Sequence, residues 1–139
     1  MTSTTHWLRM ALLACFSLIA ATSLRATDRM QTGNWEKSVT IKGHTATSTR
    51  CVTKEEAISV NGDTKSARAY AEKELKGTCN IQAYDVTGNT ITSRMDCEGT
   101  LIEMTFTYHG DTYEGVSKST LQGTQTTMTF KGRRLGSCQ

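Results

Sequence analysis

Residues 79–97 read CNIQAYDVTGNTITSRMDC, and this stretch decides the fold. Gly88-Asn89, near its middle, is typical of a tight hairpin turn, because both residue types tolerate a positive φ. On the return side every second residue is apolar or small, the period of two that indicates a strand with one buried face: Ile91, Ser93, Met95 and Cys97. The stretch therefore predicts a β-hairpin.

A disulfide between Cys79 and Cys97 would close the open end of this hairpin. With the two cysteines opposite each other, the register pairs Ile81 with Met95 and Ala83 with Ser93. A slip of one residue would turn the apolar side chains to the other face, so the cysteine pairing and the face pattern support the same register.

Residues 1–26 predict a secretory signal peptide. Arg9 precedes an apolar run over residues 10–21, and small residues follow it. The run is about half of what a bilayer span needs, so we expect cleavage rather than anchoring. The four residues that end at Cys15 resemble a lipoprotein cleavage site, but the apolar run continues past them, so we expect Cys15 to leave with the signal. The sequence thus predicts a periplasmic or secreted protein.

The remaining residues, 27–139, have the length of one domain. Loss of Arg9 and Arg25 with the signal lowers the formal net charge from +3 to +1. This near balance gives no basis for binding nucleic acid or an anionic membrane surface. No second long apolar run follows, so we expect no membrane span.

Four cysteines follow the predicted signal: Cys51, Cys79, Cys97 and Cys138. An even number in an exported protein indicates two disulfides, although four cysteines allow three connectivities. Pairing Cys79 with Cys97 leaves Cys51 with Cys138, which ties the front of the domain to its end.

Alternating segments elsewhere predict a mainly β fold. Residues 33–41 and 45–52 form two strands, the second Thr-rich and typical of an edge, and further strands follow over 100–109, 112–121 and 124–131. Between them, residues 54–76 indicate a helical insertion. We expect an antiparallel meander curled into a small barrel or half-barrel, similar to lipocalins, because one apolar face per strand must be buried.

The helical insertion carries capping signals. Thr53 and Glu56 fit a capping box, in which Thr53 accepts from the amide of Glu56 and the Glu56 carboxylate reaches back to the amide of Thr53. Asp63 or Thr64 is expected to cap a second helix, which Gly77 ends.

Five short motifs resemble a known family: GNWE (33–36), CVTKEEA (51–57), GNTITSRMDCEG (88–99), YHGDTYEG (108–115) and GRRLGSC (132–138). Together they are similar to the small exported bacterial proteins known as domain of unknown function 3617. Lys54 stands where that family usually carries proline, and a Met- and Pro-rich insert between the first two strands is missing. The resemblance implies an exported, mostly β protein and brings no activity.

The reactive side chains predict no enzyme, metal or cofactor. His44 and His109 lie beside turn glycines and form no metal-ligand spacing. The acidic pairs Glu55-Glu56 and Asp96/Glu98 are explained by helix capping and by the exposed face of the hairpin. Lys131, Arg133 and Arg134 form a basic cluster, which we interpret as a solvated strand end rather than an anion site.

An apolar stripe supplies the candidate ligand-binding residues: Trp35, Met95, Ile102, Met104, Phe106, Tyr108, Met128 and Phe130. These side chains either fill a core or line a cavity for an apolar ligand. The first hypothesis is a non-enzymatic binding module for a small apolar molecule. The alternative is an interaction module that docks an envelope protein through a sheet edge. The sequence leaves the oligomeric state open.

Overall fold

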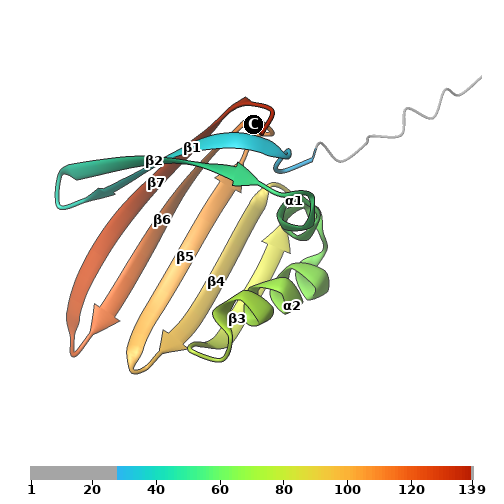
Figure 1. Ribbon diagram of the computed structural model, residues 1–139. Coiled ribbons are helices and arrows are strands. Elements are labelled where there is room, and N and C mark those ends of the chain that lie inside the picture. Colours follow the sequence, from blue (N-terminus) through green and yellow to red (C-terminus); the bar gives the residue numbers. More distant parts are fainter. Residues whose placement is uncertain (1–27, 139) are drawn as a thin grey trace, which may run out of the picture.

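A computed structural model describes residues 28–138 of the chain, so the predicted signal peptide and Cys15 lie outside the described residues. It contains one seven-stranded antiparallel sheet and two helices (Figure 1). The strands are β1 (Gly33–Ile41), β2 (His44–Val52), β3 (Asn80–Thr87), β4 (Thr90–Cys97), β5 (Thr100–Tyr108), β6 (Thr112–Leu121) and β7 (Thr124–Gly136). The helices are α1 (Lys54–Asn61) and α2 (Thr64–Leu75).

The strand order is β2-β1-β7-β6-β5-β4-β3, which confirms the predicted antiparallel meander. Within the described residues the sheet curls but does not close, since β2 and β3 are both edges (Figure 1). A half-barrel is therefore confirmed and a closed barrel is wrong. The reason lies at the β3 edge, which α2 covers: the amide of Val86 donates to Thr64 Oγ1 at 3.1 Å, and Arg68 donates to the carbonyl of Ile81 at 2.9 Å.

Two-residue turns connect four pairs of neighbouring strands, namely β1–β2, β3–β4, β4–β5 and β6–β7. Lys42-Gly43, Glu98-Gly99 and Gln122-Gly123 each have two positive φ angles, between 48° and 84°. This is the backbone of the turns whose twist matches that of the flanking strands. In the turn Gly88-Asn89 only Gly88 has a positive φ, of 56°.

The hairpin of β3 and β4 contains an irregularity that the sequence did not predict. Ile81 pairs with Met95 as expected, but the register then shifts, so Ala83 lies opposite Arg94 and Tyr84 opposite Ser93. The predicted pairing of Ala83 with Ser93 is wrong. The bulge at Gln82 turns half-buried Tyr84, rather than the small Ala83, towards the helices.

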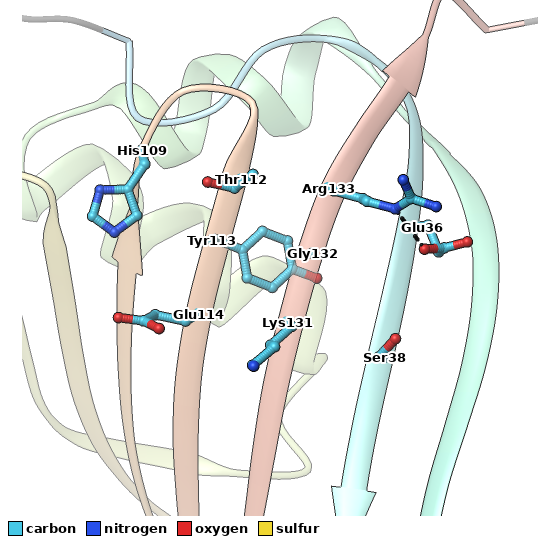
Figure 2. Close-up of a pocket in the computed structure, with 9 residues that line it drawn as sticks. All are labelled: Glu36, Ser38, His109, Thr112, Tyr113, Glu114, Lys131, Gly132 and Arg133. Atoms are coloured by element: carbon cyan, nitrogen blue, oxygen red, sulfur yellow. Dashed lines mark hydrogen bonds and ion pairs between the residues drawn. The ribbon is translucent and has the colours of Figure 1, made fainter.

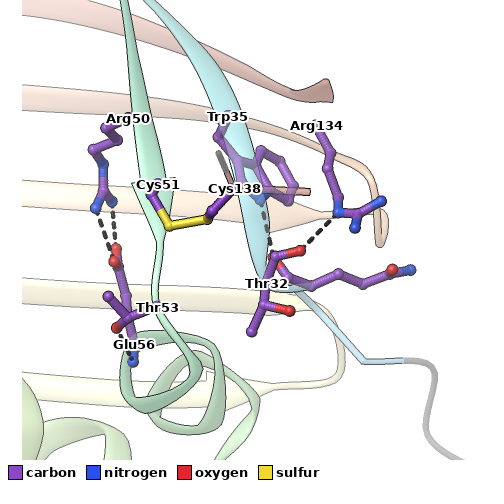
Figure 3. Close-up of a disulfide and its surroundings, with 9 residues drawn as sticks. Thr32, Trp35, Arg50, Cys51, Thr53, Glu56, Arg134 and Cys138 are labelled. Atoms are coloured by element: carbon purple, nitrogen blue, oxygen red, sulfur yellow. Dashed lines mark hydrogen bonds and ion pairs between the residues drawn. A yellow bond between two sulfur atoms is a disulfide. The ribbon is translucent and has the colours of Figure 1, made fainter. Parts of the chain in front are cut away.

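Both helices begin at predicted caps. Thr53 Oγ1 accepts from the amide of Glu56 at 3.2 Å, and Asp63 Oδ1 accepts from the amide of Ser66 at 2.8 Å. The second half of the capping box is wrong, because both Glu56 carboxylate oxygens bind the Arg50 guanidinium instead (Figure 3). A charge-assisted, two-point hydrogen bond outcompetes a single bond to a backbone amide.

The two predicted disulfides are confirmed. Cys51 is bonded to Cys138 over a separation of 87 residues (Figure 3), and Cys79 to Cys97 over 18 residues. Such bonds persist in oxidising environments outside the cytoplasm.

One cluster of the buried core lies at one end of the sheet, where the β1–β2 hairpin and α1 meet, and consists of Met30, Trp35, Val52 and Ala57. The other buried apolar residues of the described chain are Ala67, Ile81, Ile91 and Met95. Neither described helix is long and apolar enough to cross a membrane. We call the sheet face that packs against the helices the inner face and the opposite one the outer face.

Candidate functional site

Two rows of side chains cross the inner face. The strand registers align Ile91, Phe106, Gly115 and Phe130 in one row, and Ser93, Met104, Ser117 and Met128 in the next. The structure therefore brings most of the predicted apolar stripe onto one face.

Phe106 is the centre of an aromatic network on this face. Its ring centroid lies 5.3 Å from that of Phe130, 6.0 Å from that of Tyr113 and 6.4 Å from that of Tyr108. Tyr113 also stacks on Trp35 at 5.8 Å. Sequence reasoning missed Tyr113, although its position, two residues before Gly115 on an alternating strand, places it on the same face.

The members of the stripe differ in burial. Trp35 is 2% exposed and donates its indole N–H to the carbonyl of Gln31 at 2.9 Å, so it belongs to the core. Met95 is 5% exposed. The other members are only half-buried: Ile102, Met104, Phe106, Tyr108, Met128 and Phe130. Much of the stripe thus remains accessible to solvent.

A hollow of about 260 Å³ lies between α2 and strands β3 to β5, and we call it the inner hollow. Four predicted ligand-binding residues line it: Met95, Met104, Phe106 and Tyr108. Trp35, Ile102, Met128 and Phe130 do not. Sequence reasoning missed the rest of the wall, which comes from Val60, Ala71, Glu74, Leu75, Tyr84, Ile91 and Ser93.

The inner hollow is apolar and shields the phenol of Tyr108. Burial raises the pKa of this phenol well above its usual range, since the ionised form would lose its hydration. The geometry suits an apolar guest more than a charged one in direct contact with this ring.

A larger and more polar hollow, about 450 Å³, lies over β1, β6 and β7 (Figure 2). It brings together His109, Lys131 and Arg133, whereas Arg134 turns away and donates to the carbonyl of Thr32 at 2.8 Å. Arg133 donates to Glu36 at 2.7 Å, and this hydrogen bond lowers the pKa of Glu36. Because these groups face water, their pairing contributes little energy.

Three of the four acidic side chains that the sequence singled out are engaged in structural contacts, including Glu56, which binds Arg50. Glu55 accepts from Lys73 at 2.9 Å, and Asp96 accepts from the amide of Gly99 at 2.9 Å. Across residues 28–138, no three His, Cys, Asp or Glu side chains are grouped as metal ligands would be. His44 lies at the far end of the β1–β2 hairpin, opposite Ile41.

An open seven-stranded antiparallel sheet, cross-linked by two disulfides and with an apolar hollow beneath its helices, defines a half-barrel protein. The chain belongs to the family described as protein of unknown function (DUF3617), whose model matches residues 30–138. No significant match was found among curated proteins or among solved structures.

Proposed function

We propose that this protein is a non-enzymatic binding module for a small apolar ligand, which occupies the inner hollow. The observation that carries the proposal is the state of the inner face. Trp35 and Met95 are buried, but most of its aromatic and methionine side chains are only half-buried, on a face that the helices cover in part.

Burial of this surface by a guest would be favourable, by about 25 cal/mol for each Å² of apolar area. The inner hollow, at about 260 Å³, lies just under the range of about 300–1,000 Å³ typical of ligand pockets. A small molecule or part of an alkyl chain therefore fits best. Met95 and Met104 are flexible enough to adapt to the guest.

The proposal includes export to the periplasm. The two disulfides agree with an oxidising compartment, and the predicted signal at residues 1–26 would direct the chain there.

Binding of the apolar dye N-phenyl-1-naphthylamine, followed by its fluorescence, tests the proposal. Met104→Glu places a charge in the inner hollow and should abolish binding. Thr105→Glu, the next residue on β5, faces outward and should leave binding unchanged. Ser93→Phe fills the hollow without adding charge, so it should also block the dye in a folded protein. Equal binding by all three variants would refute the proposed site.

A second candidate function is docking of an envelope protein at the β2 edge. Eight of the nine β2 residues are exposed. Among the described residues, no hydrogen bond reaches the backbone of β2 on the side away from β1, whereas α2 covers the corresponding edge of β3. An unprotected edge strand can accept a further strand from a partner. Thr47→Lys should abolish capture of such a partner from an envelope extract, while Thr127→Lys on β7 should not.

A further inference from the structure

We propose that the ligand of the inner hollow is an amphipathic anion, an unbranched alkyl carboxylate. Its headgroup binds Lys37, and its chain runs over Phe130 and Phe106 into the hollow. This inference rests on the proposed function and names the chemical class of the guest.

The charges of the sheet are divided between its faces. All five carboxylates within strands lie on the outer face: Glu36, Asp85, Asp96, Glu103 and Glu114. The inner face of the strands carries cations instead, namely Lys37, Arg50 and Arg134. An anion approaching this face therefore meets no strand carboxylate.

Among these three cations, Lys37 is the one that is left for a ligand. Arg50 is bound by both oxygens of Glu56. Arg134 donates to the carbonyl of Thr32, and its Nη1 lies 4.0 Å from Asp111 Oδ1. Lys37 forms no ion pair within residues 28–138, and its partners in register are the uncharged Ser48 and Gly132.

A continuous apolar path joins this ammonium group to the inner hollow. Lys37 Nζ lies 5.2 Å from the ring centroid of Phe130, and that centroid lies 5.3 Å from the one of Phe106, which lines the hollow. An alkyl chain laid along the two rings would bury its methylene groups while the headgroup stays at the ammonium.

Glu74 determines which end of the ligand enters the inner hollow. This α2 carboxylate borders the inner hollow on the helix side, away from β1. A carboxylate headgroup placed there would be repelled, whereas at Lys37 it gains a charge-assisted hydrogen bond.

Calorimetric titration of the oxidised protein with three twelve-carbon probes tests the inference: dodecanoate, dodecan-1-ol and dodecyltrimethylammonium, each below its micelle concentration. We expect dodecanoate to bind about tenfold more tightly than dodecan-1-ol, the effect of one charge-assisted hydrogen bond. Lys37→Met should remove this preference and Lys37→Arg should keep it. Lys131→Met, on the outer face of the adjacent β7, is the matched control and should also keep it.

Each other outcome is decisive. Equal binding of dodecanoate and dodecan-1-ol, or a preference for the cationic probe, overturns the inference and leaves the apolar site in place. Failure of all three probes overturns both proposals. A preference that survives in a folded Lys37→Met variant, checked by its thermal transition, overturns the role of Lys37.

Discussion

The ring of Phe106 on β5 lies directly over Gly115 on β6. A Cβ atom on Gly115 would overlap Phe106 Cδ1, and one on Gly132 would overlap the ring of Tyr113. Because both glycines lack a side chain, these two rings can lie over the neighbouring strands instead of projecting away from the inner face. This arrangement keeps the inner face lined with aromatic surface while leaving space for a guest.

Gly115→Ala should therefore destabilise the fold. The added methyl group would force the Phe106 ring away, and such overpacking costs about 1–3 kcal/mol. Urea unfolding measures the loss. The control is Val116→Ala on the outer face, where the side chain is 39% exposed and a change within about 0.5 kcal/mol is expected. Equal stability of Gly115→Ala and the wild type would show that the ring is free to move.

The two disulfides should differ in their contribution to stability. In the chain-entropy model the bond closing 18 residues contributes about 3 kcal/mol and the bond closing 87 residues about 4 to 5 kcal/mol. Chemical denaturation of the double variants Cys79→Ser/Cys97→Ser and Cys51→Ser/Cys138→Ser should show the larger loss for the second. The reverse order would contradict this account of the long link.

Tyr108 should limit stability at alkaline pH. Burial raises the pKa of its phenol in the folded state, so the folded protein holds this proton at a pH where the unfolded chain releases it. The contribution of Tyr108 is fully present below about pH 10 and is lost as the pH rises further. Tyr108→Phe should therefore lose less stability between pH 9 and 11 than the wild type in parallel unfolding curves. Identical slopes would contradict the shift.

Substitutions of Trp35 and of Phe106 should differ in effect: those of Trp35 should change the stability of the fold, and that of Phe106 should change ligand affinity. Trp35 is packed in the core, so Trp35→Ala is expected to cost about 3–5 kcal/mol, and the milder Trp35→Phe should leave the affinity for the apolar dye unchanged. Phe106→Ala should lower that affinity, because the ring lines the inner hollow. Loss of dye affinity in a folded Trp35→Phe variant would instead extend the site to the core.

Much of the fold could be predicted from local patterns. The alternation in residues 90–97 and the two-residue turns define strands and their connections, and pairing Cys79 with Cys97 left one partner for Cys51. The bulge at Gln82 could not be predicted, since either register keeps Ile81 opposite Met95. The regular and the bulged register differ in the burial of Tyr84, which depends on α2.

The site was harder to predict because it is built by contacts between distant segments. Whether the sheet closes depends on whether Thr64 and Arg68 form hydrogen bonds with the β3 edge. The spacing of apolar residues in the sequence does not predict these bonds. The small side chains Ala71 and Ser93 form part of the wall of the inner hollow. In a sequence such small residues indicate a weakly packed core, but in this fold their small size leaves room for the inner hollow.

The most direct test of the central claim uses the methionine methyl groups. In an NMR titration of methyl-labelled protein with dodecan-1-ol, the resonances of Met95 and Met104, which line the inner hollow, should shift. The resonance of Met30, which is buried in the core and does not line the inner hollow, serves as the internal control and should not. Unchanged Met95 and Met104 resonances, or shifts confined to Met30, would contradict a ligand in the inner hollow.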